Sequence, residues 1–243
     1  MTYCVGLLLN RGLVFMSDTR TNSGVDNIST YRKMFTWSKP GERVITMLTA
    51  GNLATTQAVV SLLDERTKIP AERNPSLLET PSMFQVASLV GETLREVIES
   101  SSPHGETADS GFGATIILGG QIASGEPRLF LIYPEGNFIE ASGDTLYFQS
   151  GETKYGRPIL GRAIDPDMSF EEAVKLLMVS FDSTLKANLT VGMPLDLQIY
   201  EKDSFAVGAE RRFERDDPYY QAISSGWGEA LKNALGALPD FEL

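Results

Sequence analysis

The chain opens with two apolar runs on either side of a short turn, and this pattern constrains the fold more than any other feature of the sequence. Residues 2–9 (TYCVGLLL) and residues 13–17 (LVFMS) are both apolar. Asn10, Arg11 and Gly12 between them are residue types favoured in turns. The pattern predicts an antiparallel hairpin, so the chain begins with sheet and not with the strand–helix–strand alternation of a doubly wound fold.

The predicted hairpin returns charged residues to the amino terminus. A three-residue loop over residues 10–12 places Cys4 opposite Asp18 and Thr2 opposite Arg20, with all four side chains on one face. Cross-strand neighbours of this kind have Cβ atoms roughly 4.5–5.5 Å apart. A register shift of one residue would turn Asp18 to the other face.

A lysine heads the next apolar run. Lys33 precedes residues 34–37, and residues 43–50 (RVITMLTA) then lead into Gly51. A third strand that begins at Lys33 brings an ammonium group beside Asp18. We therefore expect an ion pair between Lys33 and Asp18 near the first strand.

Thr2 is a candidate nucleophile once Met1 has been removed, which the small side chain of Thr2 permits. The new terminus then carries a hydroxyl group and, as its own base, a free α-amine. The amine accepts a proton only when neutral; its reference pKa is about 7.7–8.0, and a nearby cation such as Lys33 lowers that pKa. Taken alone, Thr2 is more often an ordinary strand residue, and a pair such as Asp18 with Lys33 is more often a weak surface ion pair.

The charge of the chain argues against two classes of partner. The 243 residues include 21 basic and 32 acidic side chains, giving a net charge of -11. Nucleic acids and anionic membranes both require a basic surface, so we expect neither as a partner. The amino terminus lacks the pattern of a secretory leader, and no apolar run reaches the length of a membrane span. We expect a cytoplasmic protein.

The counts of reactive residues exclude further chemistry. The sequence contains one cysteine, Cys4, and one histidine, His104. A zinc site of Cys and His ligands and a disulfide within the chain are therefore both impossible. His104 lies in a loop by composition, and Cys4 is expected to be a small core residue. We expect no metal site and no cofactor.

The remaining elements alternate between helices and strands. Helices are predicted at residues 52–68, at 83–99 and after a capping box of Ser169 and Glu172. Further strands are predicted at residues 114–118, 129–133, 145–148 and 195–200. Several strands are continuous apolar runs, which indicates sheets buried on both faces. Two stacked sheets with helices on each outer side meet this requirement, so we predict an α+β fold, a four-layer αββα sandwich.

The end of the chain differs in character, so we divide the chain into a domain at residues 1–212 and a helical tail at 213–243. Asp217 and Pro218 form a helix start, and apolar residues recur at helical spacing as far as Gly236. The tail packs either on its own core or, through its aromatic residues Tyr219, Tyr220 and Trp227, on a neighbouring subunit.

These residues carry a family resemblance. The start at Thr2, the triplet at residues 18–20 (DTR), the segment 31–35 (YRKMF) and residues 49–51 (TAG) resemble the N-terminal-threonine peptidases of the proteasome β type. Residues 180–197, followed by the long tail, are similar to the bacterial Anbu (ancestral β subunit) group. The resemblance implies the αββα sandwich of N-terminal nucleophile (Ntn) hydrolases and a threonine-type endopeptidase.

The resemblance also assigns roles to residues. It implies that Thr2 attacks the peptide carbonyl and that Asp18 and Lys33 tune its amine. The backbone N–H of Gly51 would stabilise the oxyanion, and Arg20 would brace the loop before Lys33 and line the substrate cleft.

Two positions depart from the family pattern. Either Ser150 or Glu152 takes the place of a serine close to the nucleophile, and Asn188 and Thr190 take the places of an aspartate and a serine. An uncharged Asn188 can still form a hydrogen bond with the Thr2 amine, but the network is weaker electrostatically.

Three functions remain open from the sequence. The first is a threonine endopeptidase that hydrolyses peptides or unfolded proteins within a ring or spiral of identical subunits. The second is an Ntn amidase or acylase that acts on small amides, and the third is a non-catalytic assembly subunit. The sequence does not identify an ATPase partner.

Overall fold

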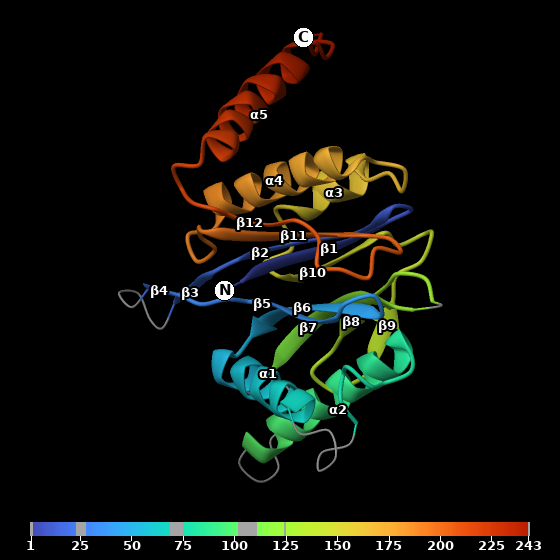
Figure 1. Cartoon of the computed structure of the whole chain (residues 1–243). Helices are drawn as coiled ribbons and strands as arrows, with labels where there is room; N and C mark the ends of the chain where they lie inside the picture. Colours follow the sequence, from blue (N-terminus) through green and yellow to red (C-terminus); the bar gives the residue numbers. More distant parts are fainter. Residues whose placement is uncertain (1, 23–27, 69–74, 102–110, 124, 243) are drawn as a thin grey trace.

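The computed structural model describes residues 2–22, 28–68, 75–101, 111–123 and 125–242. Two five-stranded sheets lie face to face, and a pair of helices covers the outer face of each (Figure 1). This arrangement confirms the predicted four-layer αββα sandwich. A last helix extends from the outside of one helical layer.

The first sheet contains the amino-terminal hairpin at its centre. Its strand order is β10-β1-β2-β11-β12, and neighbouring strands are antiparallel. The strands are β1 (Tyr3–Leu9), β2 (Gly12–Asp18), β10 (Tyr147–Gly151), β11 (Leu195–Glu201) and β12 (Glu210–Phe213). The hairpin predicted from the opening residues is confirmed, and β1 lies between β10 and β2.

The second sheet has the order β5-β6-β7-β8-β9. Its strands are β5 (Met34–Lys39), β6 (Arg43–Gly51), β7 (Ala114–Ile122), β8 (Arg128–Ile132) and β9 (Phe138–Glu140). A separate two-stranded sheet of β3 (Arg20–Asn22) and β4 (Ile28–Thr30) is formed by the segment that connects β2 to β5. Lys33 directly precedes β5, as the apolar pattern predicted.

Helices cover both sheets. The second sheet carries α1 (Leu53–Lys68) and α2 (Met83–Ser101), and the first carries α3 (Arg157–Ala163) and α4 (Phe170–Ala187). The predicted capping box before α4 is confirmed, because Glu172 N donates to Ser169 Oγ and Ser169 N donates to the Glu172 carboxylate. Within the described part of the chain, no helix combines the length and apolar composition needed to cross a membrane.

Strand β1 is buried on both of its faces. Tyr3 and Val5 pack with the α4 residues Leu177 and Phe181, whereas Cys4 packs between the sheets. The Tyr3 and Phe181 rings lie 4.4 Å apart between centroids. Burial on both faces explains the continuous apolar run that the sequence displays.

The register of the hairpin differs from the prediction by one residue. Leu9 pairs with Gly12, so the loop contains two residues, and Cys4 lies opposite Ser17 instead of Asp18. Gly12 is part of β2, where an added Cβ would lie 2.0 Å from the Tyr200 backbone oxygen. The close approach of β11 thus requires a glycine that the sequence pattern assigned to the turn.

Helix α5 (Pro218–Gly236) confirms the predicted start at Asp217, whose side chain accepts hydrogen bonds from Tyr219 N and Tyr220 N. The first turns contact α4, and the Tyr220 hydroxyl donates to Asp182 Oδ1 at 3.1 Å. None of the described residues in α5 is fully buried, and the helix leads away from the sandwich (Figure 1).

A pair of phenylalanine substitutions tests this packing. Phe181→Ala should lower the free energy of unfolding by roughly 3–5 kcal/mol, because it leaves a cavity between α4 and β1. Phe241→Ala, at a side chain 86% exposed beyond α5, should change it by less than about 0.5 kcal/mol. Urea unfolding at equal protein concentration measures both. Similar losses in the two variants would contradict this account of the core.

Candidate active site

Asp18 and Lys33 form a buried ion pair where the end of β2 meets the start of β5. Lys33 Nζ lies 2.7 Å from Asp18 Oδ1, and the two side chains are 5% and 0% exposed. Lys33 Nζ also donates to the Arg20 backbone oxygen at 2.6 Å. Asp18 accepts from Tyr3 N at 3.0 Å and from Gly192 N at 3.2 Å. The carboxylate therefore joins β1, β5 and the segment before β11.

The groups around Asp18 affect the pKa of its carboxyl group in opposite directions. Burial raises the pKa of Asp18 above its ordinary value, and the Lys33 ammonium and the N–H groups of Tyr3 and Gly192 offset part of that rise. Three donors around one carboxylate stabilise its ionised form, which gives Lys33 a counter-ion in the protein interior.

Thr2 lies directly beside this pair. The residue is almost fully buried, and the hydrogen bond from the next amide, Tyr3 N, to Asp18 holds the chain there. On the other side, Glu152 N donates to the Thr2 backbone oxygen at 2.7 Å. Gly151 has a φ of +85°, and an added Cβ would lie 1.9 Å from the same oxygen. A glycine is therefore required beside Thr2.

Cys4 lies at the middle of a row of small side chains across the sheet. It is opposite Ser17 on β2 and Ser150 on β10. Its thiol donates to the Thr49 backbone oxygen at 3.6 Å, and burial raises its pKa. Cys4 is therefore a neutral core thiol, as expected. Among the described residues, the buried hydroxyls of Ser17 and Ser150 have no hydrogen-bond partner.

The end of β6 brings a glycine to the same region. Thr49 N donates to the Lys33 backbone oxygen at 2.9 Å, which fixes β6 beside the ion pair. Two residues later, Gly51 has a φ of +115°, and an added Cβ would lie 2.5 Å from the Gly113 oxygen. Gly51 is exposed at the strand end, so its backbone is accessible.

Glu152 and Asn188 form a second polar pair next to Thr2. Asn188 Nδ2 donates to Glu152 Oε2 at 2.8 Å, and Glu152 is buried. Asn188 Oδ1 accepts from Thr190 N at 2.9 Å and from Thr190 Oγ1 at 2.6 Å. These bonds orient the amide so that its NH₂ group faces Glu152. The carboxylate in this part of the site thus comes from Glu152.

Arg20 supports the site from outside, together with a glycine that the sequence reasoning did not single out. Its guanidinium donates to the Leu189 oxygen at 2.8 Å. It also fills the space beside Gly192, where an added Cβ would lie 2.1 Å from Arg20 Nε. The contact with Arg20 requires a glycine at position 192, and the backbone N–H of Gly192 also donates to Asp18. The sequence signal that could have pointed to Gly192 is its position two residues after the candidate residue Thr190.

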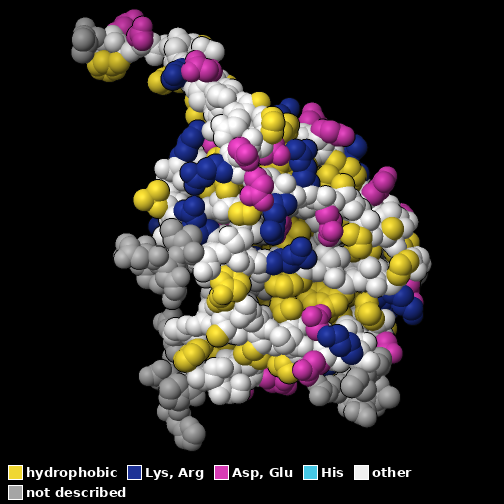
Figure 2. All heavy atoms as spheres, turned by 60° about the vertical axis from the view of Figure 1, so that its left-hand side comes forward, with side chains coloured by type: hydrophobic (Ala, Val, Ile, Leu, Met, Phe, Trp, Pro, Cys, Tyr) yellow, Lys and Arg dark blue, Asp and Glu magenta, His cyan; other side chains and the backbone are white. Residues whose placement is uncertain are grey.

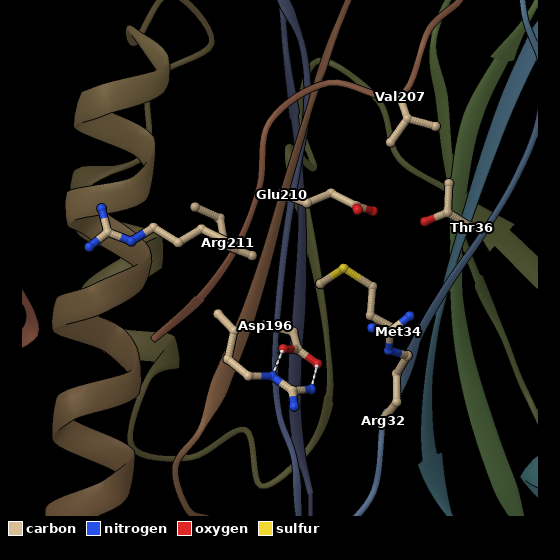
Figure 3. A pocket seen from close by; sticks show the side chains of 9 residues that line it. Arg32, Met34, Thr36, Asp196, Val207, Glu210 and Arg211 are labelled. Atoms are coloured by element: carbon tan, nitrogen blue, oxygen red, sulfur yellow. Dashed lines mark hydrogen bonds and ion pairs between the residues drawn. The ribbon is translucent and has the colours of Figure 1, made fainter. Parts of the chain in front are cut away.

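A groove of about 430 Å³ lies between the edge strands β5 and β12 and is lined by Arg32 and Met34, the sequence neighbours of Lys33. In Figure 3, Glu210 extends from β12 toward Thr36 on β5. Gln198 Nε2 donates to both Thr36 Oγ1 and Glu210 Oε1, at 2.9 and 3.0 Å. Arg212, which also lines the groove, forms a double hydrogen bond with Asp196. Because charges of both signs line it, the groove favours neither anions nor cations.

Two sequence features lie apart from this site. Asp182 is buried against α5, where it pairs with Lys186 at 2.9 Å and accepts from Tyr220. His104 falls outside the described residues. The structure groups no three His, Cys, Asp or Glu side chains, among the residues it describes, in a way that would hold a metal ion.

The family follows from comparison with known proteins. A family model described as "Proteasome subunit" matches residues 2–197, most of the chain. The chain belongs to the proteasome subunit family. A curated relative, proteasome subunit beta of Methanocaldococcus jannaschii, is 25% identical over 214 residues, which cover 88% of each chain.

Solved structures of this family agree over the whole chain. Anbu (ancestral beta-subunit) from Yersinia bercovieri is 48% identical, with a TM-score of 0.93 and full coverage of both chains. Anbu from Hyphomicrobium sp. strain MC1 is also 48% identical, with a TM-score of 0.92 and full coverage. A structure of the helical assembly of the Anbu complex from Pseudomonas aeruginosa is 46% identical, with a TM-score of 0.92 over 99% of this chain and 98% of that one.

The buried ion pair predicts a specific pattern of stability. Asp18→Asn should lower the free energy of unfolding by roughly 3–5 kcal/mol, because Lys33 is left charged and without a counter-ion. Adding Lys33→Met to that variant should recover most of the loss, since no buried charge remains. Urea unfolding of the two single variants and the double variant gives the coupling.

The exposed pair of Glu229 and Lys232 on α5 provides the control, because Glu229→Gln should leave stability unchanged within error. A double variant as unstable as Asp18→Asn alone would show that lost packing, and not an unpaired charge, is the cause.

Proposed function

We propose that this chain is a threonine-type endopeptidase that uses Thr2 as its nucleophile after removal of Met1. The observation that carries the proposal is the buried Asp18–Lys33 pair, which is hydrogen-bonded to the amide that follows Thr2. Membership of the proteasome subunit family supports a hydrolase, and a peptidase in particular. We further propose that the protein acts in the cytoplasm on peptides or unfolded proteins.

The first chemical step needs only Thr2. Its Oγ attacks the carbonyl carbon of the peptide, and its α-amine takes the hydroxyl proton and becomes an ammonium. The amine must be neutral at the start, and the positive charge of Lys33 close by favours that form. When the tetrahedral intermediate collapses, the ammonium gives its proton to the leaving amine, and an ester on Thr2 remains. A water molecule then hydrolyses this ester.

The developing oxyanion requires a hydrogen-bond donor. The N–H of Gly51 is our candidate, because it lies at the exposed end of β6 and has no side chain that would block a substrate. Loss of one such donor typically costs about 2.7–4 kcal/mol in the barrier. Arg20 acts indirectly in this scheme, since it holds the backbone around Lys33 and Gly192.

Glu152 and Asn188 complete the electrostatics of the proposed mechanism. The ammonium that forms on Thr2 needs negative charge nearby, and Glu152 supplies a second buried carboxylate besides Asp18. Asn188 orients this carboxylate by one hydrogen bond of 2.8 Å. In this view, the acidic group that the family resemblance places at residue 188 has moved to residue 152. Ser150 of β10 pairs with Cys4 of β1, so it lies on the same face of the sheet as Cys4.

Self-association is part of the proposal. A helical assembly is described for the similar Anbu complex from Pseudomonas aeruginosa. We propose that this chain also works as an oligomer of identical subunits.

The amidase alternative shares the same nucleophile, so substrate choice separates the two. A panel that contains unstructured peptides and small acyl amides should show hydrolysis of the peptides at the higher kcat/KM. A strong preference for small amides would instead support the amidase.

Substitution of the nucleophile gives the main test of the proposal. Thr2→Ala should abolish peptide hydrolysis, because alanine has no hydroxyl group to attack the peptide carbonyl. Thr2→Ser keeps a hydroxyl group and should keep part of the activity. Rates are measured on a fluorogenic peptide panel. Thr145→Ala, at an exposed turn residue, is the matched control and should retain the parental rate. Parental turnover by a folded Thr2→Ala variant would rule out the mechanism.

A carboxylate exchange tests the role of Glu152. Glu152→Gln should lower kcat about tenfold or more, which corresponds to about 1.4 kcal/mol of lost stabilisation in the transition state. Glu152→Gln combined with Asn188→Asp reverses the same hydrogen bond and returns a carboxylate to the pair. This double variant should recover most of the lost kcat. An unchanged kcat in Glu152→Gln, or no recovery in the exchange, would remove Glu152 from the mechanism.

A further inference from the structure

A cationic pocket lies beside the root of α5, on the side of the site that Arg20 occupies. Its volume is about 340 Å³, and three cationic side chains, Arg20, Lys186 and Arg215, line it together with apolar residues such as Leu189 and Met193. No carboxylate is among the described residues that line it. In a chain with a net charge of -11, such a pocket is suited to an acidic ligand.

Two of the three cations have no acidic partner among the residues that the structure describes. Lys186 pairs with Asp182 at 2.9 Å. In the part of the chain that the structure describes, neither Arg20 nor Arg215 forms an ion pair, and the Arg20 guanidinium donates only to the Leu189 backbone oxygen. Leu189 is 85% exposed at the same place. The pocket therefore offers unpaired positive charge next to an exposed apolar surface.

The far end of the tail has the complementary chemistry. After α5 the chain continues through Leu238 and Pro239 to Asp240, Phe241 and Glu242. Phe241 is 86% exposed and Leu238 is 63% exposed. Figure 2 shows acidic and hydrophobic side chains at the end of the protruding tail, and Lys and Arg side chains gathered on the body below it. An acidic segment with an apolar anchor fits a cationic pocket with an apolar wall.

The tail cannot reach the pocket of its own chain. Tyr220 and Ser224, in the first two turns of α5, line the pocket themselves. The 19 residues of α5 span roughly 28 Å at 1.5 Å per residue, and residues 240–242 lie beyond its far end. The helix leads away from the sandwich (Figure 1). An occupant of the pocket that has this sequence must therefore come from a second copy of the chain.

We infer that residues 238–242 of one copy bind the pocket of Arg20, Lys186 and Arg215 on another copy. The inference rests on the proposed self-association and not on peptide hydrolysis. Each copy carries both surfaces, so the contact either closes reciprocally in a dimer or continues from copy to copy into a ring or a helix. Arg20 also connects the pocket to the candidate site, because its backbone oxygen accepts from Lys33 and its side chain packs on Gly192.

The experiment uses charge reversal on both surfaces of the full-length chain. The tail variant carries Asp240→Lys with Glu242→Lys, and the pocket variant carries Arg215→Glu; all three side chains are exposed. Arg20 stays unchanged because of its contacts with the site, and Lys186 because it pairs with Asp182. The control variant exchanges Glu229 and Lys232 on α5, which keeps the net charge. Unfolding midpoints establish that every variant is folded.

Native mass spectrometry and light scattering at several concentrations measure assembly. The tail variant and the pocket variant should each associate at least tenfold more weakly than the parent, whereas the control variant should match the parent. In a mixture of the two variants, the unchanged tail of the pocket variant should bind the unchanged pocket of the tail variant, and a 1:1 pair should form. The combined variant, with all three reversals, should associate more strongly than the tail variant, because the carboxylate introduced at position 215 attracts the tail lysines while Arg20 and Lys186 remain cationic.

Three results would overturn the inference. Tail and pocket variants that assemble like the parent would show that this contact is absent, while leaving self-association intact. A weakened tail variant that neither pairs with the pocket variant nor recovers in the combined variant would show that the tail binds elsewhere. A parent that stays monomeric would remove the inference and the proposed self-association together, and the hydrolysis assays would still decide the enzymatic proposal.

Discussion

The structure depends on the buried ion pair of Asp18 and Lys33 between its two sheets. Lys33 precedes an edge strand of one sheet, and Asp18 ends a central strand of the other. A charged pair in the interior is stable only if each partner has further hydrogen bonds, and here the backbone of Tyr3, Arg20 and Gly192 supplies them. The pair therefore fixes the relative positions of β1, β3, β5 and the segment before β11, which are the elements that surround Thr2.

Glycines let the same elements approach closely around this pair. A side chain at Gly151 would overlap the Thr2 backbone, and one at Gly192 would overlap the Arg20 guanidinium. Positive charge from Lys33 and negative charge from Asp18 and Glu152 then lie within one small region that is mostly buried. Such an arrangement suits a reaction in which an amine starts neutral and becomes positively charged. The same residues join this region to Arg20 and, through it, to the cationic pocket beside α5.

Much of this could be predicted from sequence, where local patterns determine structure. The capping box at Ser169, the start of α5 at Asp217 and the apolar strands of both sheets follow from local rules, and the structure confirms them. The hairpin register was predicted wrongly, because the role of Gly12 is set by a neighbouring strand more than 180 residues away in sequence. The bond between Glu152 and Asn188 and the contribution of Gly192 also join distant segments, so no local pattern predicts them. The assignment of Asp18 and Lys33 to one site did come from sequence, although the roles of the individual residues remain predictions.

The most direct test of the central claim is the intact mass of the protein purified from its own cells, combined with a peptidase assay on the same preparations. The account requires a free amine on Thr2, so it predicts that Met1 is absent and that specific activity rises in proportion to the Met1-free fraction. Quantitative retention of Met1 in a preparation that hydrolyses peptides would contradict the account, because a Thr2 whose nitrogen is part of a peptide bond has no basic amine to accept the proton.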